Sequence, residues 1–212
     1  MKSIMNKYEM LYEDKIEMDS HTLYRIRALK DFGNVKAGDI GGYIEKEANL
    51  SQEGICWIYD NAKVYDNAWV CGNVWVYGNA KVYGDAWVYG NAWVYGNAWV
   101  YGNAKVYGNT KVYGDAGIGG NALIYDSVKV CGGAKISKSN DILCITPIGS
   151  RNDATTFFKT KDNNIGVNCG CFTGTIDDFL EAVNKTHGEN KHAKAYKLAC
   201  ELARVQIELE DV

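Results

Sequence analysis

Residues 87–92 read Trp-Val-Tyr-Gly-Asn-Ala, and residues 93–98 repeat this hexapeptide without a change. Outward from these two copies, the same unit recurs fourteen times between Trp57 and Asn140. Lys often replaces the first Trp, and Asp often replaces Asn. A short and fixed period of this kind predicts a solenoid, in which each repeat packs mainly on its neighbours.

The pattern inside each unit predicts how the solenoid is wound. Ala and Val alternate with Trp or Lys and Tyr, so the first pair shares one face of a strand and the second pair shares the other. The Gly-Asn or Gly-Asp that follows tolerates positive φ and suits a corner. Three corners close one coil of eighteen residues. We therefore predict a left-handed parallel β-helix with three units per coil, about four to five coils and ~22 Å long.

A chain of β-hairpins is the competing interpretation, because Gly-Asn is also a two-residue hairpin turn. Two-residue loops would place Tyr opposite Ala, and Val opposite Trp or Lys. Cross-strand partners share a face of the sheet, so each face would mix core and surface residues. The solenoid keeps Val over Val and is favoured.

An eighteen-residue coil stacks the outward residues in columns. The predicted columns are Trp57, Trp75, Trp93, Lys111 and Lys129; Trp69, Trp87, Lys105 and Leu123; and Lys63, Lys81, Trp99, Gly117 and Lys135. Tyr59, Tyr77, Tyr95 and Tyr113 form a neighbouring column, as do Tyr65, Tyr83 and Tyr101, and Tyr89, Tyr107 and Tyr125. Stacking across coils accounts for part of this aromatic content. Whole columns of exposed Trp nevertheless exceed the usual apolar patch of a monomer, and Trp and Tyr are enriched at interfaces.

We therefore predict that the aromatic surface binds a ligand or a partner. The candidate residues are Trp57, Trp69, Trp75, Trp87, Trp93, Trp99, Tyr77, Tyr95, Lys63, Lys81, Lys105 and Lys111. Aromatic rings beside lysines suit a stacked base or sugar whose phosphate meets an ammonium group. Burial of Trp columns between copies of the chain is the other reading.

The two flanks of the repeat are not repetitive. Residues 1–56 are predicted to form a β cap, with strands at Tyr8–Leu11, Lys15–Met18 and Leu23–Leu29. The glycines at 38, 41 and 42 weakly resemble a phosphate loop, but a corner and capping role is favoured. Residues 57–140 are the solenoid. Residues 141–212 are predicted to form a small α+β module with a hairpin, a helix from Thr175 and a helix from Lys191 to about Leu209.

Composition restricts the function less than the repeat does. The net charge is −3, so bulk electrostatics favours neither nucleic acid nor an acidic membrane. No secretory or membrane-spanning segment is visible, and seven scattered cysteines suggest free thiols. We expect a cytoplasmic protein of a bacterial host that requires no cofactor.

Two stretches resemble a known family. Phe32–Ile44 and Leu50–Ala62 are similar to the segment that leads into the repeat of uncharacterised hexapeptide-repeat proteins of phages, prophages and bacteria. These proteins are often labelled putative acyltransferases, and the resemblance covers about residues 8–140. Thr156–Thr160, Cys169–Phe172 and Thr186–Gly188 resemble a module of phage-encoded proteins. The resemblance implies the solenoid fold and a phage or prophage origin.

The catalytic residues that this resemblance implies are mostly missing. Acyltransferases of this fold use a histidine between subunits, and the related carbonic anhydrases hold zinc with three coil histidines. This chain has His21, His187 and His192, all outside the repeat. Cys169 and Cys171 with His187 and His192 could supply four metal ligands, but the spacing fits no standard zinc site. We therefore predict neither a catalytic residue nor a metal site.

Three functions remain open at this point. The first is a non-enzymatic, oligomeric phage or prophage protein that binds a host protein or a nucleotide-like ligand, for example an anti-defence factor. By analogy with enzymes of this fold, the oligomer is expected to be a trimer. The second is an acyltransferase with its site between subunits. The third is a structural spacer in a phage assembly.

Overall fold

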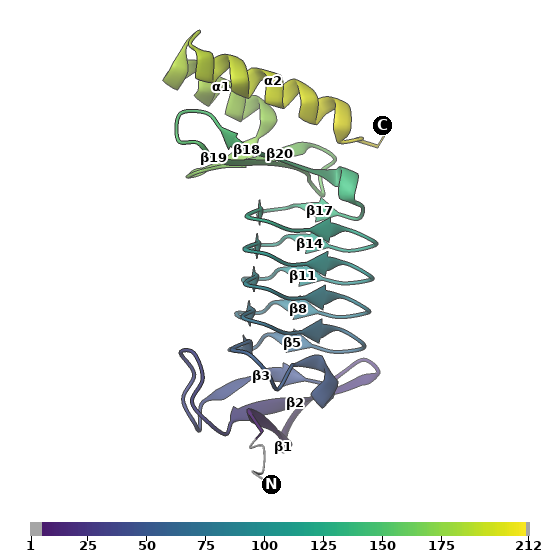
Figure 1. The fold of residues 1–212 in the computed structure, drawn as a ribbon. Coiled ribbons are helices and arrows are strands. Elements are labelled where there is room, and N and C mark those ends of the chain that lie inside the picture. Colours follow the sequence, from purple (N-terminus) through teal and green to yellow (C-terminus); the bar gives the residue numbers. More distant parts are fainter. Residues whose placement is uncertain (1–5, 211–212) are drawn as a thin grey trace.

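The computed structural model describes residues 6–210 as a column with a different cap at each end (Figure 1). Strands β1 (Tyr8–Met18), β2 (His21–Ala28) and β3 (Ile40–Ile44) form the N-terminal cap. A parallel β-solenoid follows and is the body of the molecule. A four-stranded sheet covers its far end, and two helices lie on the outer side of that sheet. The predicted mainly-β solenoid fold is confirmed.

Each solenoid strand is only two residues long. The strands are β4 (Trp57–Ile58), β5 (Lys63–Val64), β6 (Trp69–Val70), β7 (Trp75–Val76), β8 (Lys81–Val82), β9 (Trp87–Val88), β10 (Trp93–Val94), β11 (Trp99–Val100), β12 (Lys105–Val106), β13 (Lys111–Val112), β14 (Gly117–Ile118), β15 (Leu123–Ile124), β16 (Lys129–Val130) and β17 (Lys135–Ile136). They form three parallel sheets, named here by their central strands. The β10 sheet has the order β16-β13-β10-β7-β4, and the β9 sheet has the order β15-β12-β9-β6. The β11 sheet contains β5, β8, β11, β14 and β17 and continues through β3 into the N-terminal cap.

The register confirms the predicted columns. Trp93 pairs with Trp75 on one side and with Lys111 on the other, eighteen residues away in both directions. The valines of the repeat are fully buried, and its alanines are buried between them. Corner glycines such as Gly78 and Gly96 have φ of 71° and 72°. Asp60, Asp66 and Asp126 take the glycine position at three corners and also have positive φ.

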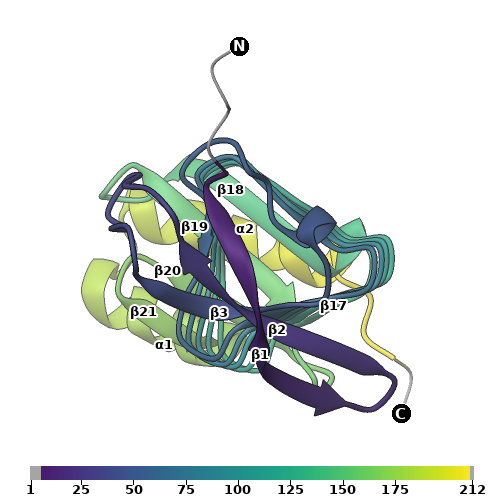
Figure 2. The same ribbon diagram turned by 90° about the horizontal axis from the view of Figure 1, so that it is seen from below.

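The N-terminal cap is wound differently from the repeat. β1 is a single strand whose register slips between Leu11 and Lys15, where the sequence predicts two strands. β3 opens the first coil early, as the residue pairs Tyr43-Ile44 and Asn49-Leu50 suggest. Ile44 pairs with Val64, twenty residues on, so the first coil is two residues longer than the others. A short 3-10 helix, Glu47–Asn49, lies in this coil. Figure 2 shows the β1–β2 hairpin lying across the triangular end.

The C-terminal sheet consists of β18 (Ile142–Ile148), β19 (Asp153–Lys159), β20 (Ile165–Cys169) and β21 (Phe172–Thr175). A second 3-10 helix, Ser139–Asp141, precedes it. β21 is absent from the sequence prediction. One face of the sheet meets the solenoid, and Phe158 joins the solenoid core. The other face packs against α1 (Ile176–His187) and α2 (Lys191–Gln206) through a second core that includes Phe157 and Phe179.

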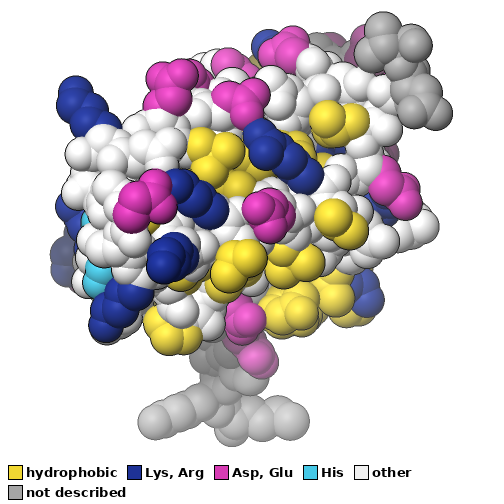
Figure 3. All heavy atoms as spheres, turned by 90° about the horizontal axis from the view of Figure 1, so that it is seen from above, with side chains coloured by type: hydrophobic (Ala, Val, Ile, Leu, Met, Phe, Trp, Pro, Cys, Tyr) yellow, Lys and Arg dark blue, Asp and Glu magenta, His cyan; other side chains and the backbone are white. Residues whose placement is uncertain are grey.

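The α2 segment carries two apolar stripes, and only one of them is covered. Tyr196, Ala199 and Ala203 are buried against the sheet and α1. The second stripe, Leu198, Leu202, Val205 and Leu209, is exposed at this end of the molecule, where Figure 3 shows apolar side chains among charged ones. Within residues 6–210, neither helix is long and apolar enough to cross a membrane.

Candidate functional site

The predicted aromatic surface begins one coil later than the sequence indicates. Trp57 is predicted on the solvent side, and this is wrong. Its indole is 1% exposed because Tyr8 and Phe32 pack edge-on against it, at centroid distances of 6.2 and 5.4 Å. The N-terminal cap has turned the first ring of this column into core, so Trp57 is unavailable to a partner.

The next two coils of the same sheet line a shallow groove, called here the Trp75 groove. It has a volume of 420 Å³ and is lined by Asn34, Tyr59, Asp60, Trp75, Tyr77 and Trp93. In each coil Trp and Tyr flank one valine and point outward together, so the groove runs between a Trp column and a Tyr column. Four of its six lining residues are aromatic. Three of the predicted site residues, Trp75, Tyr77 and Trp93, therefore meet in one cavity.

The rings that line this groove stack on one another. Trp75 and Trp93 lie 5.2 Å apart with 13° between their planes, and Tyr77 and Tyr95 lie 4.7 Å apart with 2° between theirs. Tyr113 continues the Tyr column at 5.0 Å and accepts a hydrogen bond from Asn168 Nδ2. Ring faces inside such a column are occupied by neighbouring rings, so a ligand meets ring edges. This arrangement argues against the predicted stacking of a base on an interior ring.

The predicted lysines are also engaged within the chain. Lys111 Nζ lies 4.2 Å from the centroid of Trp93, Lys105 Nζ lies 5.0 Å from Trp87, and Lys81 Nζ lies 4.9 Å from Trp99. Lys63 Nζ donates to the Asn61 carbonyl and lies 6.0 Å from the Tyr43 ring. Each of the first three ammonium groups covers the Trp that neighbours it in its own column. These contacts weaken the expectation that the lysines meet a phosphate.

The remaining Trp residues lie on the other two sheets and are more exposed. Trp69 and Trp87 meet edge to face at 5.6 Å on the β9 sheet and are 38% and 43% exposed. Trp99 is alone on the β11 sheet at 45% exposure, with Tyr83 against its edge. The predicted site residues are thus spread over three sheets. Two Trp residues, Trp75 and Trp93, line the Trp75 groove.

Two tyrosines of the column beside the groove have raised pKa values and stay neutral. Burial raises the pKa of Tyr77, and its neighbour Tyr95 adds to the shift. Burial, together with Cys131, raises the pKa of Tyr113 to about 12. Asp60 is the one carboxylate that lines the groove, and its Oδ2 accepts a hydrogen bond from the Gly78 amide at 2.9 Å. The groove is therefore an apolar contact surface and shows no nucleophile–base pair.

His21 lies between two acidic side chains, a group that the sequence analysis did not describe. His21 Nδ1 lies 2.9 Å from Glu45, and its Nε2 lies 3.4 Å from Asp66. In the described chain this is the group with ligand atoms close enough for a metal. Since each carboxylate faces a different ring nitrogen, the geometry fits a protonated imidazole between two acids better than a metal bound by all three.

The four candidate ligands of the C-terminal module are not brought together in this way within residues 6–210. The Cys169 thiol contacts the hydroxyls of Thr155 and Tyr196, at 3.1 and 3.7 Å. The rings of His187 and His192 lie 5.9 Å apart, and the His187 ring lies 5.9 Å from that of Tyr196. Three of the four candidates, Cys169, Cys171 and His187, line one 230 Å³ cavity with Arg151, but their ligand atoms are not close enough together to share a metal ion.

Comparisons with known proteins address the repeat. The YdcK Beta solenoid repeat matches residues 86–102. The chain is also 55% identical over 38 residues to a protein of Escherichia coli (strain K12) named "Uncharacterized acetyltransferase YdcK". That match covers 18% of this chain and 12% of the length of the relative. It is little more than two coils long, so the similarity is to the solenoid repeat and leaves the activity of this chain to be proposed.

Proposed function

We propose that the protein is a non-catalytic binding protein that associates with further copies of itself through the Trp75 groove. The observation that carries this proposal is the groove itself, an apolar cavity of 420 Å³ lined mainly by the edges of stacked rings. Stacked columns hold Trp and Tyr rigid, so burying them costs little side-chain entropy. A protein surface, which supplies aliphatic groups and ring faces to these edges, fits the groove better than a phosphorylated ligand.

A partner protein would use the surfaces that self-association leaves open. Trp69, Trp87 and Trp99 are each more than a third exposed and lie on the other two sheets. Under the phage-type resemblance, this partner would be a protein of the bacterial host, and the complex would form in its cytoplasm. A trimer is the oligomer that the analogy with enzymes of this fold favours.

The test of self-association is a matched pair of Trp→Lys variants. Trp93→Lys alters the groove, whereas Trp87→Lys makes the same change on the β9 sheet. Both columns continue naturally with a lysine, at Lys111 and Lys105, so the solenoid tolerates lysine at the next rung of each. Sedimentation velocity should show that Trp93→Lys shifts the protein toward monomer, while Trp87→Lys sediments like the unaltered chain. Equal sedimentation of all three proteins, or a monomeric unaltered chain, would refute the proposal.

Acetyl transfer is the second candidate, favoured by the printed name of the Escherichia coli relative. The sequence has no histidine between His21 and His187, so a base would have to come from the C-terminal module of a neighbouring copy. Calorimetry with acetyl-CoA separates the two functions. Saturable binding that His187→Ala or His192→Ala leaves intact, together with turnover that these variants abolish, would support the enzyme. No heat at millimolar acetyl-CoA would end this candidate.

A further inference from the structure

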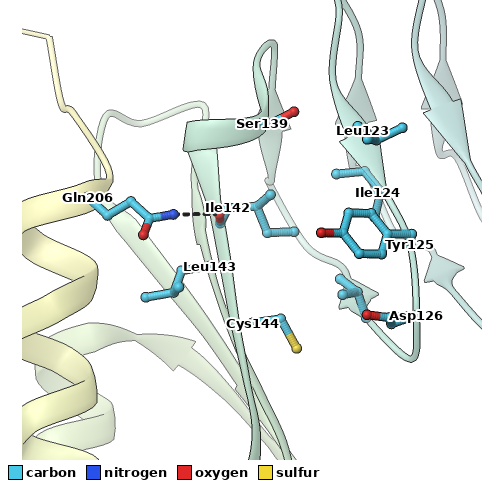
Figure 4. Close-up of a pocket in the computed structure, with 10 residues that line it drawn as sticks. Leu123, Ile124, Tyr125, Asp126, Ser139, Ile142, Leu143, Cys144 and Gln206 are labelled. Atoms are coloured by element: carbon cyan, nitrogen blue, oxygen red, sulfur yellow. Dashed lines mark hydrogen bonds between the residues drawn. The ribbon is translucent and has the colours of Figure 1, made fainter.

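The tyrosine column on the β9 sheet ends at a ring with no further ring above it. Tyr89 and Tyr107 stack at 4.7 Å, and Tyr107 and Tyr125 stack at 5.5 Å with 16° between their planes. Tyr125 is 45% exposed. The position eighteen residues on is Leu143, which lies in β18 and belongs to the C-terminal sheet. Tyr125 therefore has one face covered by Tyr107, and its hydroxyl end points toward β18 (Figure 4).

Asp126, the next residue, is also left without the contact that its counterparts make. At the corners where Asp replaces Gly, Asp60 Oδ2 accepts from the Gly78 amide at 2.9 Å, and Asp66 Oδ2 accepts from the Gly84 amide at 3.0 Å. Both donors lie one coil further along. Asp126 has the same positive φ, but the repeat does not supply a corner above it. In the described part of the chain, its carboxylate has no hydrogen-bond donor.

A cavity of 270 Å³ occupies the place of the missing rung, and we call it the terminal slot. Tyr125 and Asp126 line its solenoid side, and Ile142, Cys144 and Ser139 line the opposite side. Figure 4 shows Ile142 and Cys144 pointing from β18 toward the Tyr125 ring, while Leu143 points away toward α2. Gln206 of α2 donates to the Ile142 carbonyl at 3.4 Å and supports this wall from behind.

The two walls differ in a way that suits a flat ring. The Tyr125 ring lies on one side, and an aliphatic side chain and a thiol lie on the other. Burial raises the pKa of Cys144, and the Asp126 carboxylate adds to the shift, so this wall carries a neutral thiol. At 270 Å³ the slot is at the small end of the range for ligand pockets, so a single ring system fits and a larger cofactor does not.

We propose that the terminal slot binds a guanine-type base, stacked on Tyr125 and hydrogen-bonded through its edge to Asp126. Guanine carries two adjacent N–H donors that match the two oxygens of a carboxylate, and these bonds are charge-assisted. The base would then supply the two contacts that the last coil lacks. Its ring would stack on Tyr125, and its N–H groups would donate to Asp126. Adenine lacks this donor pair, and an anionic group is repelled by Asp126.

Two kinds of ligand carry this base, a nucleoside such as guanosine and a nucleotide such as GMP. Asp126 disfavours a phosphate inside the slot, so guanosine should bind at least as tightly as GMP. The slot lies on the β9 sheet and the Trp75 groove on the β10 sheet, so this inference is independent of self-association through that groove.

Calorimetry with the full chain tests the proposal, using guanosine, adenosine and GMP as probes. We expect saturable guanosine binding and at least tenfold weaker adenosine binding. Asp126→Asn should weaken guanosine binding about tenfold to a hundredfold, since a hydrogen bond to a charged group is lost. Asn also tolerates positive φ, so the corner should fold.

A pair of tyrosine variants separates stacking in the slot from stability of the column. Tyr125→Leu removes the ring that faces the slot, and Tyr89→Leu removes the first ring of the same column. Only Tyr125→Leu should weaken guanosine binding, by about tenfold. Equal effects of the two variants, no change in Asp126→Asn, tighter binding of GMP than of guanosine, or no binding by the unaltered chain at millimolar guanosine would each overturn the proposal.

Discussion

The middle of the solenoid and its two ends are held together by different kinds of contact. In the middle, a side chain meets its own counterpart one coil away. Tyr77 stacks on Tyr95, and Asn73 donates to Asn91, which donates to Asn109. Such contacts follow from the period alone, because any residue placed in the unit is automatically placed beside itself.

The ends depend on unlike residues that are far apart in the sequence. At the N-terminal end, Lys7 Nζ donates to the carbonyls of Glu53 and Cys56 and to the Cys56 thiol. At the C-terminal end, Asn168 Nδ2 donates to the Tyr113 hydroxyl and to Cys131 Sγ. The repeat alone therefore provides the contacts in the middle of the solenoid. At the ends, specific side chains must hydrogen-bond the unpaired backbone groups and cover the last rings.

The largest expected effect compares a corner inside the stack with a corner at its end. Gly72→Ala and Gly132→Ala both follow a cysteine and both place Ala at positive φ, 77° and 61°. That backbone strain costs about 1–2 kcal/mol in each. A methyl group at Gly72 would lie 2.9 Å from the Gly90 carbonyl oxygen, whereas nothing lies within 4 Å at Gly132. The clash should cost Gly72→Ala about 1–3 kcal/mol more.

Thermal unfolding by circular dichroism measures this difference. One kcal/mol corresponds to a shift in Tm of about 2–4 °C for a chain of this size. Gly72→Ala should therefore unfold at clearly lower temperature than Gly132→Ala. Equal values of Tm would mean that the coils adjust around an added methyl group, and the close stacking of corners would then not limit the repeat.

An intermediate effect is expected at the N-terminal end. The Tyr8 hydroxyl donates to the carbonyls of Glu47 and Leu50, and the residue is 1% exposed. Tyr8→Phe leaves both carbonyls without this donor and should cost about 1–3 kcal/mol of unfolding free energy. Tyr107→Phe is the control, because Tyr107 is held by stacking and its ring is retained. Urea unfolding should separate the two, and equal stabilities would show that the cap does not depend on this hydroxyl.

The sequence was sufficient to predict the columns because their register has a single cause. Because three six-residue units close one coil, Trp93 must lie between Trp75 and Lys111 in its column. The sequence predicted stacking across coils, but it did not show that this stacking leaves mainly ring edges to a ligand at the Trp75 groove. It also placed Trp57 outside, because the unit cannot show that Tyr8 and Phe32 fold back over the first coil.

The terminal slot was missed for a related reason. Its walls come from a corner of the repeat and from β18, and the repeat pattern describes only the first. Asp126 looks like any other corner aspartate in the sequence. The sequence ends the repeat at residue 140, but only the structure shows which residues of β18 lie above this corner. β21 escaped prediction because its four residues contain two threonines and a glycine and no alternating apolar pattern.

The smallest expected effect concerns pH and the attachment of the N-terminal hairpin. The hydrogen bond to Glu45, with the nearby Asp66 carboxylate, raises the pKa of His21. The ion pairs of His21 therefore stabilise the fold fully below about pH 6.5, its unfolded value, and lose this contribution as pH rises through the folded pKa. Urea midpoints measured from pH 6 to pH 8 should fall for the unaltered chain and fall less for His21→Gln. His192→Gln, the same change at the opposite end, should keep the unaltered slope. If His21→Gln keeps it as well, the imidazole between Glu45 and Asp66 does not couple protonation to the stability of this end.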